Sequence, residues 1–236
     1  FPHHENEIAQ SECCNGKPFA RYWLHNAFLN IDNRKMSKSL GNFFTVREIG
    51  EKYDLQVLRF FMLSAHYRSP LNFSADIMEA SKNAYERIVT AADRLKEVSA
   101  AAKSVDLTGE ENGKLEEMKQ FRAKYEEAMD DDLNTADALA AIFELVKFAN
   151  TEVTAASSKT FADRVLEEIR ELCDIQGLIV DRKKETLDEE IEAMIAERQA
   201  ARKAKDFARA DAIRDELLAK GIILEDTREG VKWKRA

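Results

Sequence analysis

Glycine and proline are scarce in this sequence, whose 236 residues include 8 Gly and 3 Pro. Both lie well below their usual share in soluble proteins, so few positions favour tight turns. Alanine, glutamate, lysine, leucine and arginine are abundant instead. The scarcity excludes collagen-like, mucin-like and predominantly β architectures, and the composition predicts a mainly helical protein.

Cysteine and long apolar runs are scarce as well. The cysteines number 3, with Cys13 and Cys14 adjacent and Cys173 distant, which argues against a disulfide scaffold and fits a reducing compartment. No apolar run approaches the ~20 residues of a membrane-spanning helix, and neither an initiator Met nor a signal-peptide pattern precedes Pro2. We therefore expect a cytoplasmic protein with no membrane partner, and a chain that is a piece of something longer.

Acidic residues outnumber basic ones by 44 to 36, but they are unevenly spread. Residues 1–75 hold nine Lys and Arg against seven Asp and Glu, and residues 191–236 hold eleven against nine. Residues 76–190 hold sixteen against twenty-eight. The two ends are thus mildly basic and the centre is acidic, which indicates modules with different partners.

The N-terminal region consists of short predicted elements separated by turns. We expect a helix that starts at Pro2, a strand or extended segment over 21–31, and then a polar loop. The spacing from Thr45 to Glu48 is that of a capping box, which opens a short helix. Asp54 is placed to cap the next helix.

The rest of the chain shows a plain helical period. Four helices joined by short loops, one of them over 102–113, predict an antiparallel bundle across 76–180. Within 186–236 we expect two helices, the second beginning at Asp206, and a terminal hairpin after Gly221.

The segment with the most chemical information begins at Lys35 and reads Lys-Met-Ser-Lys-Ser-Leu-Gly-Asn. Lys35 and Lys38 can present point charges to a polyphosphate, the serines add hydroxyl donors, and Gly41 permits a change of backbone shape. Phosphoryl chemistry requires charge stabilisation and positioning rather than covalent help, and a cationic loop supplies both. By composition alone, such a loop is more often only a solvated surface.

As a literal string, residues 35–39 resemble the signature loop of class I aminoacyl-tRNA synthetases. Residues 1–12, which read Phe-Pro-His-His-Glu-Asn-Glu-Ile-Ala-Gln-Ser-Glu, resemble the stretch that precedes this loop in cysteinyl-tRNA synthetases. The resemblance covers the whole chain, densely at both ends and loosely across 100–185. It implies a zinc-dependent cysteine–tRNA ligase, an enzyme that activates cysteine with ATP and transfers it to tRNA(Cys).

The resemblance also implies the fold: a mainly α chain with the tail of a class I Rossmann-type catalytic domain, a helical bundle and a small C-terminal α/β module. The family pairs the signature loop with an upstream His-x-Gly-His motif, which the 4 histidines here never form. We therefore expect the chain to be the C-terminal portion of the enzyme, with its N-terminal half missing. The expected domains are the end of the catalytic domain over 1–42, a connecting helical segment over 43–75, the bundle over 76–180 and an anticodon-binding module over 186–236.

Members of this family bind zinc through two cysteines, a histidine and a glutamate. His3 and Glu7 fall on the positions of that histidine and glutamate, and residues at i and i+4 share one helix face. Alone, such a pair is more often ordinary helix surface. Cys14 lies ~10 Å further along the same helix, whereas Zn–ligand bonds are only ~2.0–2.3 Å long. We expect one Zn²⁺ site whose two cysteine ligands lie upstream of Phe1, and no zinc role for Cys13 or Cys14.

The resemblance implies that Lys38 serves the triphosphate of ATP, bound with Mg²⁺, and that Lys35 has a secondary catalytic role. The expected ATP-binding residues are Lys35, Met36, Ser37, Lys38 and Ser39. In the C-terminal module, single-stranded RNA is recognised by stacking and by hydrogen bonds to base edges, so acidic side chains serve as well as basic ones. The expected anticodon residues are Arg202, Phe207, Asp211, Arg214, Asp226 and Trp233.

Several alternatives stay open on the sequence alone. Phe207 can equally belong to the core of the small module, and Trp233 can close that module against Phe207 or Ile223. The related ligase of thiol (mycothiol-type) biosynthesis shares the catalytic motifs but needs no anticodon module, so residues 186–236 argue against it. A non-catalytic tRNA-binding fragment is the third function. The expected partners of the whole enzyme are tRNA(Cys), L-cysteine, ATP and the missing half, and we expect this chain alone to be inactive.

Overall fold

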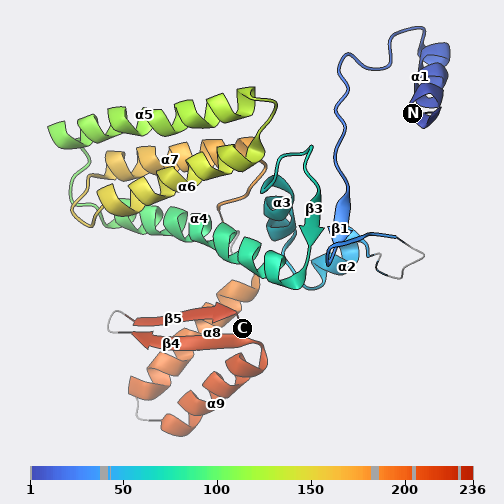
Figure 1. The fold of residues 1–236 in the computed structure, drawn as a ribbon. Coiled ribbons are helices and arrows are strands. Elements are labelled where there is room, and N and C mark those ends of the chain that lie inside the picture. The colour runs from blue at the N-terminus through green and yellow to red at the C-terminus, as the bar shows by residue number, and fades with distance from the viewer. Residues whose placement is uncertain are drawn as a thin grey trace. The chain divides into compact units, whose positions relative to one another are not determined.

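Two compact units make up the chain, residues 1–181 and residues 182–236, each with its own hydrophobic core. Figure 1 shows their elements in a computed structural model. Helices dominate both units, which confirms the mainly α prediction. Within the described ranges, no helix has the length and apolar character needed to cross a membrane. The structure describes residues 2–37, 42, 44–181, 186–203, 206–227 and 230–235.

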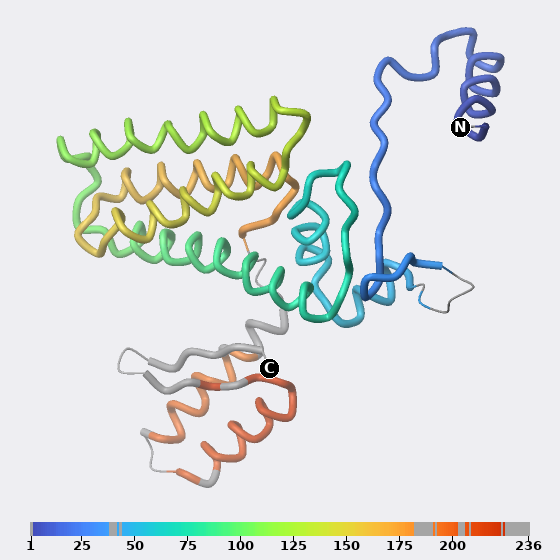
Figure 2. The backbone as a smooth tube through the Cα atoms, in the orientation of Figure 1, coloured from blue at the N-terminus to red at the C-terminus, as the bar shows by residue number. Residues whose placement is uncertain are grey.

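The first helix begins where its proline predicts. α1 (Pro2–Asn15) ends before Gly16, whose φ of +62° lies in the left-handed region that glycine readily adopts. The segment that follows is drawn as an extended trace in Figure 2, but ladder pairing begins only with β1 (Leu29–Ile31). The expectation of a strand or extended segment over 21–31 is therefore confirmed, and only residues 29–31 are a strand, because an extended segment becomes a strand only where a neighbour pairs with it.

A small sheet positions the loop that the sequence singled out. β1 lies between β2 (Arg34–Lys35) and β3 (Leu71–Phe73), antiparallel to the first and parallel to the second. The chain between β2 and β3 contains α2 (Val46–Gly50) and α3 (Leu55–Leu63). A parallel pair needs such a crossover connection, and helices commonly supply it. The signature loop thus starts directly at the end of β2.

Both predicted helix caps in this region are confirmed. The Thr45 hydroxyl accepts a hydrogen bond from the Glu48 amide at 3.3 Å, and the Glu48 carboxylate accepts from the Thr45 amide at 2.6 Å. The Thr45 hydroxyl also donates to the Glu48 carboxylate at 2.9 Å, and the bonds that this carboxylate accepts from the Thr45 amide and hydroxyl lower the pKa of Glu48. Asp54 accepts from the Gln56 amide at 2.8 Å and so starts α3. Local chemistry therefore sets both helix starts.

Four long helices form the bundle that the periodicity predicts. They are α4 (Ala75–Ala101), α5 (Gly109–Asp130), α6 (Thr135–Glu152) and α7 (Lys159–Ile175), and Figure 1 shows successive helices running in alternating directions. Each contributes buried apolar side chains to one core, which α3 also joins. Among the largest of these side chains are Phe61, Ile88, Leu95, Ile142, Leu145, Phe161, Ile169 and Leu172.

The start of α5 corrects the predicted loop over 102–113. α5 begins at Gly109, after Thr108, because Thr108 and Glu111 form a second capping box. Burial alone would raise the pKa of the Glu111 carboxyl, but its hydrogen bonds from Thr108 and Ser158 outweigh this and lower it. Ser158 caps α7, so one buried carboxylate fastens the starts of two helices.

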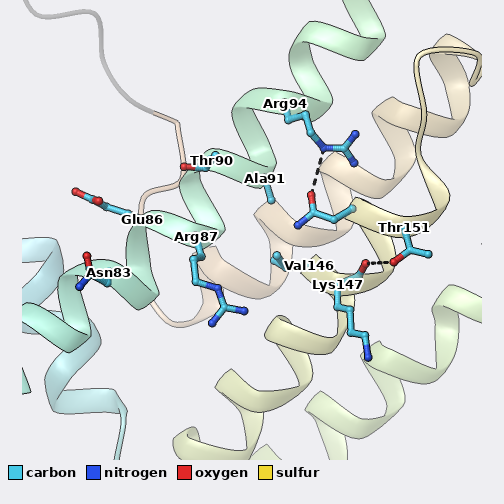
Figure 3. Close-up of a pocket in the computed structure, with 10 residues that line it drawn as sticks. Asn83, Glu86, Arg87, Thr90, Ala91, Arg94, Val146, Lys147 and Thr151 are labelled. Atoms are coloured by element: carbon cyan, nitrogen blue, oxygen red, sulfur yellow. Dashed lines mark hydrogen bonds between the residues drawn. The ribbon is translucent and has the colours of Figure 1, made fainter. Parts of the chain in front are cut away.

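A groove of about 520 Å³ between α4 and α6 has a structural role (Figure 3). The Arg94 guanidinium reaches across it and donates to the carbonyls of Ala149 at 2.6 Å and Val153 at 2.9 Å. Both carbonyls lie at the end of α6, where the Ala149 carbonyl also accepts from the Val153 amide at 3.1 Å. Arg87, which also lines the groove, lies over the Phe143 ring at 5.1 Å. Arg87 and Arg94, both on α4, thus hold α6 against α4.

The second unit is a helix pair with a hairpin. α8 (Thr186–Lys203) packs on α9 (Phe207–Ala219), and β4 (Ile222–Thr227) pairs antiparallel with β5 (Gly230–Arg235). α9 begins directly after Asp206, one residue beyond the predicted start, because Asp206 caps the helix by accepting from the Arg209 amide. Five buried apolar side chains form its described core cluster: Ile191, Ile195, Ile213, Leu217 and Ile222.

Candidate functional site

Two asparagine side chains brace the chain on either side of β2, one at the turn before it and one at the loop after it. The turn between β1 and β2 places Asp32 and Asn33 at φ +46° and +61°, and the Asn72 side chain of β3 accepts from the Asn33 amide at 2.7 Å. Beyond β2, the Asn42 side chain accepts from the Ser37 amide at 2.9 Å and donates to the Lys35 carbonyl at 3.2 Å. Asn42 therefore ties both ends of the loop together.

The five predicted ATP-binding residues belong to this loop, and the structure describes three of them. Lys35 is exposed, and Met36 and Ser37 are half-buried. Lys38 and Ser39 fall outside the described residues. Sequence reasoning missed Asn42 as a brace, although its place directly after Gly41 was visible. It had no signal for Asn72, which lies far away in the chain.

α1 presents two possible metal donors but not a metal site. His3 and Glu7 are both exposed and share one face of the helix, as their spacing predicts. Among the described residues, no group of three or more His, Cys, Asp or Glu side chains is arranged to hold a metal ion. Zinc sites in proteins use at least three protein ligands. The described residues therefore do not make a zinc site by themselves.

Unlike the exposed His3 and Glu7, His4 packs against aromatic rings of the segment that follows α1. Its ring centroid lies 5.8 Å from that of Trp23 and 5.2 Å from that of His25, both on the extended segment. Shielding from water lowers the pKa of His4, and the nearby rings of His3 and His25 lower it further. The contact joins α1 to the segment that follows it.

The three cysteines divide as the sequence suggests. Cys173 is fully buried on α7 and its pKa rises to about 12 because of that burial. Cys13 and Cys14 are exposed near the end of α1. Cys173 is therefore a core residue, and a thiol with so high a pKa is unreactive at neutral pH.

The exposed face of α9 gathers three of the predicted anticodon residues. Phe207, Asp211 and Arg214 follow one another at i, i+4 and i+7, so they share one side of the helix. All three are exposed, and Phe207 retains 62% of its surface. The opposing side of α9 carries the buried Ile213 and Leu217. The alternative in which Phe207 belongs to the core of the unit is therefore wrong.

The other predicted anticodon residues lie elsewhere in the unit. Arg202 is exposed near the end of α8. Asp226 on β4 is in register with Val231, and Trp233 on β5 is in register with Leu224. The side chains of Asp226 and Trp233 lie outside the described residues, so their parts in a site remain predictions.

Comparison with known families defines the class of protein. Residues 1–83 match the family model of the tRNA synthetases class I (C) catalytic domain, and residues 124–180 match the DALR domain. A solved ternary complex of the Agrobacterium radiobacter K84 LeuRS with tRNA and LeuAMS shares the fold, with a TM-score of 0.51 and 17% identity over 70% of this chain and 24% of that chain. The fold is that of a class I aminoacyl-tRNA synthetase.

The particular family follows from the third match and from the relatives. Residues 184–233 match the Cysteinyl-tRNA ligase anticodon binding domain. The chain is 63% identical over 236 residues to the cysteine–tRNA ligase of Lachnospira eligens, and 61% identical over 241 residues to that of Lachnoclostridium phytofermentans. These matches cover 100% of this chain but only 50% and 51% of the relatives. The chain belongs to the cysteine–tRNA ligase family and spans the C-terminal half of these relatives.

Proposed function

We propose that the protein to which this chain belongs joins cysteine to tRNA(Cys) at the expense of ATP, in the cytoplasm. The chain contributes the loop that serves the nucleotide and the unit that binds the anticodon. The observation that supports this most directly is that one chain carries both a braced Lys-Met-Ser-Lys-Ser loop and an exposed aromatic and charged face on α9. Residues 1–42, 43–75, 76–180 and 186–236 are the proposed domains.

In the proposed reaction, a cysteine carboxylate oxygen attacks the α-phosphorus of ATP, and the bond to the bridging oxygen breaks to release pyrophosphate. The tRNA 3′ end then displaces AMP and takes the cysteinyl group. Lys38 stabilises the negative charge that develops on the triphosphate, and Lys35 has a secondary role in the same stabilisation. Mg²⁺ would serve as the counter-ion of the triphosphate. Met36, Ser37 and Ser39 complete the nucleotide contacts. Asn42 holds the two ends of the loop together while negative charge develops on the triphosphate.

His3 and Glu7 are proposed to give two ligands to a zinc ion in the whole enzyme, with the other donors outside this chain. A zinc ion prefers a thiolate to a hydroxyl, so it would select cysteine over serine. The two exposed side chains of α1 support the proposal through their i, i+4 spacing.

The α9 face is proposed to bind unpaired anticodon bases, with Phe207 stacking on a base and with Asp211 and Arg214 contacting base edges. Arg202, Asp226 and Trp233 are proposed to extend this surface. The match of residues 184–233 to an anticodon-binding domain supports this function over the thiol-biosynthesis ligase, which needs no such module.

Phe207→Ala and Arg214→Ala should each weaken binding of this chain to a tRNA(Cys) transcript. Loss of a stacked base costs about 1–3 kcal/mol, so Phe207→Ala should reduce affinity by about 5- to 150-fold. The melting temperature should not change, because Phe207 is exposed. Fluorescence anisotropy at one fixed salt concentration gives the affinities.

The matched control is Arg209→Ala. The Arg209→Ala substitution removes the same charge as Arg214→Ala. Arg209, however, lies on another side of α9 and pairs with Glu197 at 2.7 Å. We expect its affinity within about twofold of the unmodified chain, since surface ion pairs contribute little. Equal losses for Arg209→Ala and Arg214→Ala would mean that net charge alone, rather than the α9 face, governs binding.

A further inference from the structure

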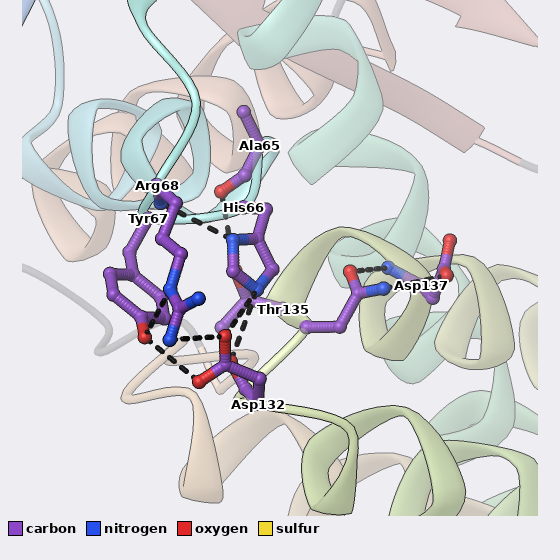
Figure 4. A network of polar contacts seen from close by, with 8 residues as sticks. Ala65, His66, Tyr67, Arg68, Asp132, Thr135 and Asp137 are labelled. Atoms are coloured by element: carbon purple, nitrogen blue, oxygen red, sulfur yellow. Dashed lines mark hydrogen bonds and ion pairs between the residues drawn. The ribbon is translucent and has the colours of Figure 1, made fainter. Parts of the chain in front are cut away.

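The turn between α5 and α6 has an unusual backbone. Asp132 and Leu133 both have a φ of +56°, a left-handed conformation that bulky residues rarely adopt. Such residues persist where their surroundings hold them, and they gather at sites with a functional demand. The amide of Leu133 donates to the Met129 carbonyl at 3.1 Å and so closes the end of α5. The turn directs the Asp132 side chain at the loop that follows α3 (Figure 4).

Three consecutive residues of that loop converge on Asp132. The Tyr67 hydroxyl donates to Asp132 Oδ1 at 2.8 Å, and Arg68 Nη2 lies 3.0 Å from Asp132 Oδ2. Arg68 Nε donates to the Tyr67 hydroxyl at 2.9 Å. The Arg68 amide donates to His66 Nδ1, so the ring donates from Nε2 to the Asp132 carbonyl, 3.1 Å away. One residue of the α5–α6 turn thus contacts the side chains of three consecutive residues of the loop.

The same loop holds the sheet on its other side. The Tyr67 carbonyl accepts from the Ala27 amide at 2.9 Å, directly before β1. A few residues later the chain enters β3, where the Asn72 side chain holds the Asn33 amide of the β1–β2 turn. β2 leads from that turn to Lys35 and the nucleotide loop. Hydrogen bonds joined by short stretches of backbone therefore link Asp132 to the strand that carries this loop.

The cluster contributes little to stability but constrains the geometry of the loop. The side chains of Arg68 and Asp132 are 66% and 41% exposed, and ion pairs at such exposure contribute little to stability. Directed hydrogen bonds from three neighbouring residues nevertheless allow only one arrangement of the loop. The cluster is therefore suited to setting geometry rather than to holding the fold together.

We propose that Asp132 is a positioning residue, which places the sheet of β1, β2 and β3, and hence the nucleotide loop, relative to the helical bundle. The proposal rests on the proposed function for its catalytic consequence and on the hydrogen bonds above for its geometry. Through this contact, the bundle and the nucleotide loop move as one body. Its removal should loosen the sheet and slow the activation of cysteine.

Asp132→Gly tests the geometry in this chain, because glycine adopts the left-handed backbone without strain and lacks only the carboxylate. We expect hydrogen exchange of the Ala27, Asp32 and Leu71 amides to accelerate by about 3- to 30-fold, with little change in melting temperature. Leu133→Gly is the control: it relaxes the same turn but leaves the cluster intact, so exchange should stay at the original rate. Original exchange rates in Asp132→Gly would overturn the proposal.

The catalytic arm uses the full-length ligase and cysteine-dependent ATP–pyrophosphate exchange. Asp132→Gly should lower kcat by about 3- to 30-fold with little change in the KM for cysteine, and Asp132→Asn should restore part of it because its amide oxygen still accepts from Tyr67. An unchanged kcat in a variant with loosened amides would overturn the positioning role. If the unmodified ligase shows no exchange activity, the proposed function fails, and the amide rates still decide the geometric link.

Discussion

Leu217→Ala should unfold the C-terminal unit while residues 1–181 stay folded. Leu217 is fully buried, and it belongs to the cluster of five buried apolar side chains that forms the described core of this unit. A buried Leu→Ala substitution costs about 2–5 kcal/mol. A core of this size rarely supplies more than about 3–5 kcal/mol in total. The substitution therefore removes most of the stability of the unit, and tRNA binding should be lost with it.

Limited proteolysis of the full chain measures this directly, since an unfolded unit is cut rapidly while the bundle is protected. Leu218→Ala is the matched control, because Leu218 is the next residue on α9 and is 58% exposed. It should leave the cutting pattern as in the unmodified chain. Equal protection of the C-terminal unit in both variants would show that its described core does not hold it together.

Lys38→Ala in the full-length ligase should reduce cysteine-dependent ATP–pyrophosphate exchange by about 10²–10³-fold, the usual effect of removing one group that stabilises charge in the transition state. The KM for cysteine should change much less, because the lysine acts where the triphosphate charge develops. Lys38→Arg should recover only part of the rate, since a planar guanidinium replaces a compact charge.

Lys52→Ala provides the comparison for Lys38. Lys52 is an exposed lysine that follows α2 and lies outside the signature loop. Its removal should leave the exchange rate near that of the unmodified enzyme. An equal rate for Lys38→Ala and Lys52→Ala would contradict the assigned role of the loop.

Local rules predicted the helix starts well, because each depends on a few neighbouring residues. Thr45, Asp54 and Asp206 cap helices where their side chains reach the first free amides. The start of α5 was missed for a related reason: Gly109 suggested a loop, whereas the capping box of Thr108 and Glu111 outweighs the cost of glycine in a helix.

The braces of the site could not be predicted in this way. Asn72 meets Asn33 and Asp132 meets Tyr67 only after the chain has folded, since 39 and 65 positions separate the partners. The i, i+4 spacing did place His3 and Glu7 on one face of α1, but a metal site needs donors from several segments. The exposed side of α9 was readable in part, because Phe207, Asp211 and Arg214 follow the helical period.

The most direct measurement of the central claim compares the affinity of this chain for two RNAs at the same salt concentration. One is a tRNA(Cys) transcript, and the other is the same transcript with its three anticodon bases replaced. We expect binding to the first to be at least about tenfold tighter, the effect of one well-recognised stacked base. Phe207→Ala should reduce this preference. Equal affinities for the two transcripts would contradict the assignment of residues 186–236 as an anticodon-binding unit.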